Sequence, residues 1–155
     1  MIGLAFGTAF KILMKAIVMP LLGAAPINSA YHYIVGNPSA LPAMLLAVIV
    51  GAGFGEETFF RGYLFERLGK LFGPGIAAKA AIVVITTVLF GLAHLREQGV
   101  AGAEQALVTG LAFGSIFALT GRLFMLMIAH AAFDLTAVAI IYWNLEPAIA
   151  HLVFR

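Results

Sequence analysis

The sequence predicts an all-α integral membrane protein, a polytopic bundle of about five transmembrane helices around a polar cavity. Of its 155 residues, 63% are hydrophobic and 10% are charged, whereas soluble domains carry about 25% charged residues. The mean hydropathy is +1.05, and a water-soluble fold of this length cannot bury that much apolar surface. In addition, residues 16–55 contain no Asp, Glu, Lys or Arg.

The apolar segments divide into five expected spans, because a bilayer core of about 30 Å takes roughly 20 residues per helix. They are expected at about residues 2–22, 41–68, 77–95, 104–119 and 123–145. Two GxxxG pairs, Gly51/Gly55 and Gly110/Gly114, are expected to allow close helix packing. No repeat, linker or low-complexity segment divides the chain, so we expect one domain over residues 1–155.

The few charges indicate orientation and partners. Most Lys and Arg residues fall near one side of this arrangement, which favours a cytoplasmic N-terminus. Membrane lipids are the first expected partner. No basic stripe with interleaved aromatic residues is present, which argues against nucleic-acid binding. The absence of cysteine excludes disulfides and thiolate metal sites. The oligomeric state is not indicated.

The most unusual feature is a doubled glutamate, Glu56-Glu57, followed by Arg61 and placed directly after the uncharged stretch. An uncompensated charge there costs roughly several kcal/mol. On a helix, Glu57 and Arg61 are four residues apart and share a face, the geometry of an ion pair. Glu56 points about 100° away, so we expect it to act as a general base. The alternative is that both carboxylates pair with basic side chains from neighbouring helices.

Two more polar pairs lie in later spans. His94 follows Phe90 by one turn near the end of the third span, where a lone histidine is usually an interfacial or hydrogen-bonded residue. His130 precedes Asp134 by four residues in the middle of the fifth span, where an Asp needs a partner. The pair either forms a local hydrogen bond that satisfies both groups, or Asp134 orients His130, or both side chains face a polar cavity. We favour the cavity, because the other two sites also need polar surroundings.

Together these residues suit hydrolysis. Glu56, His94, His130 and Asp134 would supply a base for water and donors for a tetrahedral oxyanion from three helices. A zinc site is the alternative, with Glu56, His94 and His130 as ligands. The spacing along the chain does not separate the two, and the HExxH signature is absent.

The three motifs, in this order and on separate apolar spans, resemble the CPBP family of intramembrane proteases. This family, also called Abi, includes the type II CAAX prenyl endopeptidases. Its pattern is EExxxR, then FxxxH, then HxxxN or HxxxD, and here it falls at residues 56–61, 90–94 and 130–134. The likeness covers about residues 41–141.

The resemblance implies an intramembrane endopeptidase that cleaves a membrane-associated or lipidated, CAAX-like, peptide. By this match, Glu56 and His94 activate water, and His130 and Asp134 stabilise the oxyanion. Glu57 and Arg61 would support the site. The favoured mechanism requires no cofactor, with zinc as the metalloendopeptidase alternative. The implied partner is a peptide or lipidated protein substrate, and the implied location is the cell membrane of a prokaryote.

Two departures from the family pattern matter. Asp134 stands where the endopeptidases often carry Asn. An ionised Asp cannot donate to an oxyanion, so Asp134 would have to be protonated or act by charging His130. In addition, one expected span precedes the first motif where family members usually have more, which suggests a minimal or truncated member.

Two other classes of function stay open. A membrane binding protein, such as a bacteriocin-immunity protein, could retain the site residues without turnover. A small proton-coupled transporter could use the same Glu, His and Asp residues as a relay. Transport is disfavoured, because inverted repeats are absent and the Pro and Gly breaks fall outside the span centres.

Overall fold

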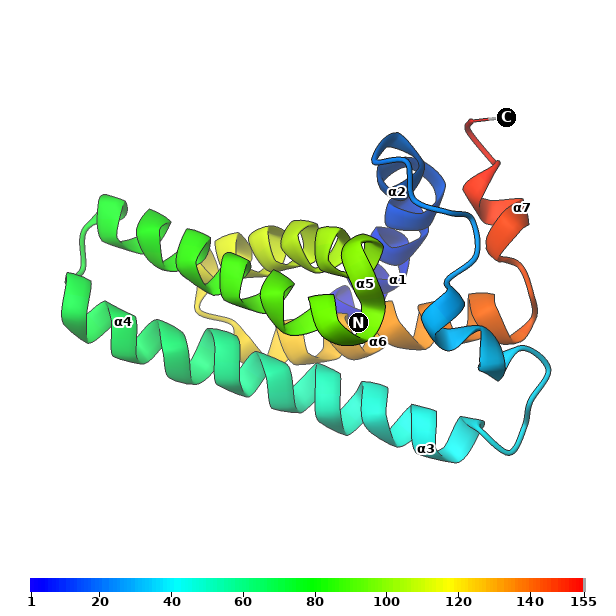
Figure 1. Ribbon diagram of the computed structural model, residues 1–155. Helices are drawn as coiled ribbons and strands as arrows, with labels where there is room; N and C mark the ends of the chain where they lie inside the picture. Colours follow the sequence, from blue (N-terminus) through cyan, green and yellow to red (C-terminus); the bar gives the residue numbers. More distant parts are fainter. Residues whose placement is uncertain (155) are drawn as a thin grey trace. The chain divides into compact units, whose positions relative to one another are not determined.

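The computed structural model describes residues 1–154, and every regular element within them is a helix (Figure 1). Four of these helices are long and apolar enough to cross a membrane. They are Ile2–Leu21, Leu41–Phe72, Ile76–Thr120 and Leu123–Tyr142. The predicted class is therefore confirmed, and the protein is an integral membrane protein.

The chain forms two compact units. The terminal unit contains Met1–Phe54 and the described residues from Met127 onward, and the central unit is Gly55–Leu126. The chain passes from one to the other inside two helical stretches. The single domain expected over residues 1–155 stays a prediction.

The terminal unit begins with one continuous helix, in which α1 (Ile2–Leu13), η1 (Met14–Val18) and α2 (Met19–Leu21) follow without a break. A short 3-10 helix, η2 (Ser29–Ile34), lies in the connecting loop, and the Asn28 side chain caps it by accepting from the Ala30 N–H at 3.2 Å. The remaining elements are α3 (Leu41–Leu46), most of η3 (Ala47–Glu56), most of α6 (Leu123–Tyr142) and α7 (Glu146–Ala150).

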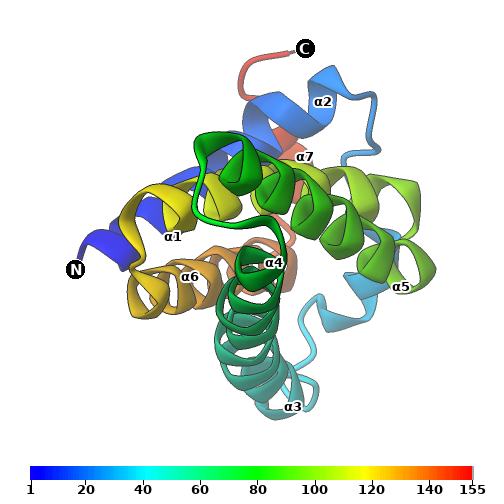
Figure 2. The same cartoon turned by 90° about the vertical axis from the view of Figure 1, so that its left-hand side faces the viewer.

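A partly buried ion pair joins the two ends of this unit. Lys15 Nζ lies 2.7 Å from Glu146 Oε1 and also donates to the Pro26 carbonyl at 2.6 Å. The same carboxylate oxygen accepts from the Asn28 N–H at 3.1 Å. In Figures 1 and 2, α7 accordingly lies beside the end of the first helix. A lysine inside an apolar span is stabilised here by an acid from the other end of the chain.

Glycines bring helices close together in the terminal unit. A Cβ on Gly7 would lie 2.0 Å from the carbonyl oxygen of Ala129, and one on Gly53 would lie 2.8 Å from the Ala131 Cβ. Gly51, by contrast, is exposed and would meet nothing within 4 Å. The packing expected at Gly51 is therefore wrong. Gly53 lies on the buried face of this helix instead. Residues two apart on a helix point in directions that differ by more than a right angle, so Gly51 and Gly53 face different sides.

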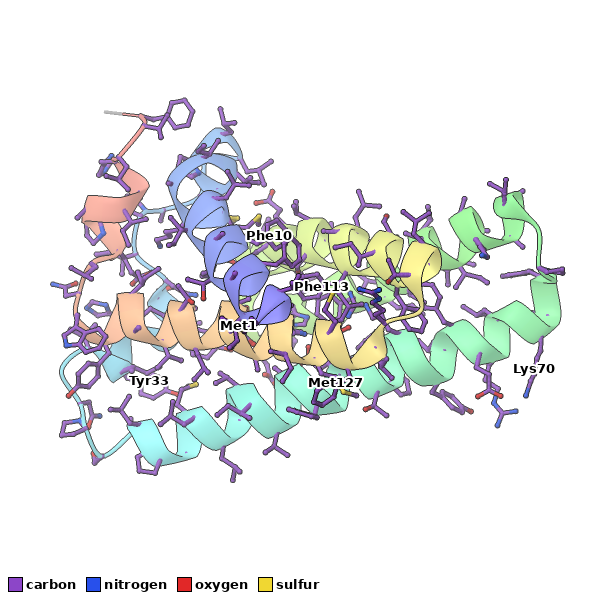
Figure 3. All side chains as sticks on the ribbon, turned by 180° about the vertical axis from the view of Figure 1, so that it is seen from behind. Met1, Phe10, Tyr33, Lys70, Phe113 and Met127 are labelled. Atoms are coloured by element: carbon purple, nitrogen blue, oxygen red, sulfur yellow. The ribbon has the colours of Figure 1, made fainter. Side chains whose placement is uncertain are left out.

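The central unit contains η4 (Thr58–Leu64), α4 (Phe65–Phe72) and the 45-residue α5 (Ile76–Thr120). α4 ends at a turn with Gly73 at φ 83°, and Lys70, labelled near that end in Figure 3, forms an exposed ion pair with Glu66. α5 consists of two helical segments joined at Gly99, whose φ of 67° and ψ of −166° are open essentially to glycine alone. The predicted third and fourth spans thus both lie within α5, on either side of Gly99.

The two segments of α5 run antiparallel, side by side (Figures 1 and 2). A Cβ on Gly110 would lie 3.3 Å from the Thr87 Cα, and one on Gly114 would lie 3.4 Å from a Val83 methyl group. Each facing pair lies at nearly equal distances in sequence on either side of Gly99, as a hairpin requires. The close packing predicted for Gly110 and Gly114 is confirmed.

Candidate active site

The first motif lies in a stretch of unusual helix. Hydrogen bonds of the π type, from residue i to i+5, run through η3 (Ala47–Glu56) and η4 (Thr58–Leu64), and Glu57 stands between them. Such segments are rare and are found frequently at functional sites. The sequence pattern carried no signal for this widening of the helix. Glu57 and Arg61, which are four residues apart, nevertheless form a pair in this segment.

Glu57 and Arg61 form the ion pair that their spacing predicted. Arg61 Nη1 donates to Glu57 Oε1 at 2.8 Å, and both side chains are buried. Arg61 Nη2 also donates to the Gly110 carbonyl at 3.4 Å. The charges therefore balance inside the protein, and the guanidinium reaches across to the second segment of α5. The supporting role assigned to both residues stays a prediction.

Aromatic rings surround the Arg61 guanidinium. Its carbon atom lies 4.7 Å from the ring centre of Phe90, 5.8 Å from that of Phe113 and 6.0 Å from that of Phe60. Phe113 is fully buried and is labelled in Figure 3, and Phe60 meets Phe90 edge-on with ring centres 4.9 Å apart. Ring faces attract a cation most strongly where water is excluded. Arg61 thus fastens η4 to both segments of α5.

Glu56 and His94 lie next to each other in the central unit. Glu56 Oε2 is 3.9 Å from His94 Nε2, and the two side chains are 32% and 17% exposed. This distance is too long for a direct hydrogen bond. The structure therefore brings the first and second motifs together. Both side chains are partly exposed, while the Glu56 Oε2 atom that faces His94 is itself buried.

The backbone fixes the orientation of His94. Its Nδ1 lies 2.8 Å from the carbonyl oxygen of Phe90, one turn earlier on the same helix. Because a carbonyl can only accept, Nδ1 carries the hydrogen, and in the neutral ring Nε2 is then an acceptor. His94 thus presents a lone pair on the side that faces the Glu56 carboxylate.

His130 and Asp134 lie on α6 in the terminal unit. His130 Nε2 is 3.6 Å from Asp134 Oδ2, within ion-pair range but longer than a hydrogen bond. His130 is buried and Asp134 is partly buried. Glu56, Glu57, Arg61 and His94 thus belong to one unit, and His130 and Asp134 belong to the other. That all of them form one catalytic site stays a prediction.

Lys11 is a charged residue that the sequence patterns did not assign to the site. It is only 7% exposed, and its Nζ lies 4.8 Å from the ring centre of Phe133, the neighbour of Asp134. The available signal was the position of Lys11 inside an apolar span, since a charge there needs a partner.

Metal ligands are few within each unit. Among residues 1–154, no group of three or more His, Cys, Asp or Glu side chains is placed to hold a metal ion. The central unit contributes Glu56 and His94, while a catalytic zinc site takes three protein ligands. His130, the third candidate ligand, belongs to the terminal unit. Zinc binding by these three residues stays an alternative to be tested.

The fold and these residues define a helical membrane protein with ionisable groups buried in its spans. A family model, Type II CAAX prenyl endopeptidase Rce1-like, matches residues 38–136. The match covers more than half of the chain and includes all three motifs, so the protein belongs to this family. The family name gives no support to a metal-dependent mechanism in particular. No curated protein and no solved structure matches the chain.

Proposed function

We propose that the protein is an intramembrane endopeptidase that hydrolyses a peptide bond in a membrane-associated or lipidated, CAAX-like, peptide. The observation that carries the proposal is the arrangement of Glu56 and His94. A carboxylate oxygen and an imidazole acceptor lie 3.9 Å apart, on side chains that are still partly accessible. Membership of a family of prenyl endopeptidases supports the same chemistry.

On this proposal, a water molecule bridges these two acceptors. Placed about 2.8 Å from each, it can donate one hydrogen to Glu56 and the other to His94 Nε2. Both hydrogens are then held, and the lone pairs of the water oxygen point outward to a substrate carbonyl. As that oxygen bonds to the carbonyl carbon, Glu56 accepts the proton. Protonated Glu56 then donates it to the leaving amine as the C–N bond breaks.

The oxyanion that forms in this step needs a donor. His130 is the proposed donor, and Asp134 is the group that controls its charge. Because Asp134 Oδ2 faces Nε2 of His130, an ionised Asp134 favours the imidazolium, in which both ring nitrogens donate. Nδ1 could then serve the oxyanion. Such preorganised donors typically supply a large share of the rate enhancement in acyl transfer.

The central unit gives Glu56 a rigid support. Glu57, the neighbour of Glu56 in the chain, is held by Arg61, which is in turn packed among three aromatic rings. Glu56, the proposed base, therefore lies on a helical segment that the contacts of Arg61 hold in place. The proposed location is the cell membrane of a prokaryote, where a lipidated peptide would reach the site from the lipid.

The test is a peptidase assay with purified protein in detergent. A panel of prenylated and unmodified peptides is offered to the wild type, to Glu56→Gln and to the control Glu66→Gln, which removes an exposed acid on α4. The proposal expects cleavage by the wild type and by Glu66→Gln and none by Glu56→Gln, with all three folded. If the wild type cleaves nothing and still protects cells from a peptide toxin, the protein is a binding or immunity protein.

A further inference from the structure

We propose that an exposed strip along η4 and α4, formed by Phe59, Tyr63 and Arg67, binds an acidic phospholipid. Arg67 holds the phosphate of the headgroup, and the two rings line an acyl chain. All three residues belong to the central unit. This binding does not depend on the endopeptidase chemistry.

The strip is a continuous stack of side chains spaced four residues apart. The rings of Phe59 and Tyr63 are stacked, with their centres 5.9 Å apart and their planes 19° apart. The guanidinium carbon of Arg67 lies 5.2 Å from the centre of the Tyr63 ring. Each side chain therefore lies one turn from the next along one side of the helix, and the cation lies at one end of the stack.

The strip is open to the surroundings of the protein. Phe59 and Tyr63 are each 49% exposed, and Arg67 is exposed as well. Phe60 is buried and meets the Phe59 ring edge-on with ring centres 5.1 Å apart, which supports that ring from behind. Exposed aromatic rings on a spanning helix are typical of the boundary between acyl chains and headgroups.

The length of the helix places the cationic end of the strip among the headgroups. Residues 41–72 extend over about 48 Å as a helix, whereas the hydrocarbon core is about 30 Å thick. Beyond the first motif, the charges of this helix are Glu66, Arg67 and Lys70, all of them exposed. Exposed charges are costly in hydrocarbon, so this end extends into the headgroup region. Phe59 then lies up to about 12 Å deeper, beside the acyl chains.

The charges near this end favour an acidic lipid. Three cations, Arg67, Lys70 and Lys79, and one acid, Glu66, flank the turn between α4 and α5. Glu66 forms its ion pair with Lys70, and the N–H donors of a guanidinium match a phosphate in bidentate geometry. A zwitterionic headgroup would bring its own ammonium into this cationic region. An acidic headgroup complements it.

Lipid binding to the purified full-length chain tests this surface. Phosphatidylglycerol and phosphatidylcholine are titrated separately in detergent, and bound lipids are counted by native mass spectrometry. The variants are Arg67→Gln, which removes the cation, and Tyr63→Leu, which removes the ring that it contacts but keeps an apolar side chain. Arg96→Gln is the matched control. Arg96 is also an exposed arginine of the central unit, but it lies near Gly99 with the acid Glu97 beside it.

The wild type should prefer phosphatidylglycerol, and added salt should reduce this preference, because salt screens exposed charges. Arg67→Gln should weaken phosphatidylglycerol binding by about fivefold, the effect expected for one cation at an anionic surface. Tyr63→Leu should show a smaller loss, and Arg96→Gln should bind like the wild type. Thermal unfolding checks that all variants are folded.

Equal binding of the two lipids by the wild type, or equal phosphatidylglycerol binding by the wild type and Arg67→Gln, would overturn the proposal. A variant Arg67→Gln that keeps its lipid binding but loses cleavage of peptides with a free C-terminal carboxylate would assign Arg67 to the substrate instead. The lipid measurements require no cleavage. Failure of the proposed function would therefore leave this test intact.

Discussion

The guanidinium carbon of Arg61 lies 4.7 Å from the ring centre of Phe90, and the carbonyl oxygen of Phe90 in turn accepts from His94 at 2.8 Å. One phenylalanine therefore links the last residue of the first motif to the histidine of the second. Its ring contacts the cation, and its backbone orients the imidazole. The four-residue spacings of Glu57–Arg61 and of Phe90–His94 fit these contacts, because residues four apart lie one helical turn apart.

Removing the guanidinium should destabilise the protein strongly. In Arg61→Ala, the Glu57 carboxylate would stay buried without its partner, at a cost of about 3–5 kcal/mol. Arg61→Lys should recover only part of this, since an ammonium does not reproduce the planar fork that contacts Glu57 and Gly110 together. Thermal unfolding in detergent measures the effect. Arg122→Ala, at an exposed turn, is the control, and equal stability of the two alanine variants would contradict the prediction.

The adjacent carboxylates should respond differently to the same substitution. Glu56→Gln should lower kcat by about 10²–10⁴-fold, as expected for loss of a general base, with little change in unfolding temperature. Glu57→Gln should instead lower the unfolding temperature, because it removes the charge that balances buried Arg61. Measuring kcat and unfolding for both proteins separates the roles. A stable, inactive Glu57→Gln beside an active Glu56→Gln would reverse the assignment.

Local sequence rules predicted those parts of the molecule that depend on local geometry. The Glu57–Arg61 pair follows from helical spacing, and the all-helical membrane class follows from composition. The single-residue break at Gly99 and the burial of Gly53 in place of Gly51 were not predictable in this way. Each depends on which surface another helix presents, and the sequence contains 17 glycines. Lys11 was missed for a similar reason, because Phe133, whose ring it contacts, is far away in the chain.

Removing metal should leave peptide cleavage intact. On the proposed mechanism, Glu56 and His94 hold the attacking water through its two hydrogens, and no step requires a metal ion. The wild type is treated with a strong chelator, desalted into metal-free buffer and assayed beside an untreated sample. Equal rates are expected. Loss of activity that returns on adding Zn²⁺ would instead favour the zinc site of Glu56, His94 and His130, and it would make these residues metal ligands.

Two glycine substitutions should have opposite effects on stability. Gly99 adopts φ 67° and ψ −166°, so Gly99→Ala should cost about 1–3 kcal/mol of backbone strain. Gly69 lies inside α4, where an added Cβ meets nothing within 4 Å, so Gly69→Ala should stabilise by about 0.5–1 kcal/mol. Because Gly99 joins the two segments of α5, its substitution should also disturb the contact of Arg61 with both segments and reduce cleavage. Unfolding curves and kcat of the two variants test this, and a Gly99→Ala protein as stable and active as Gly69→Ala would show that the hairpin does not need this conformation.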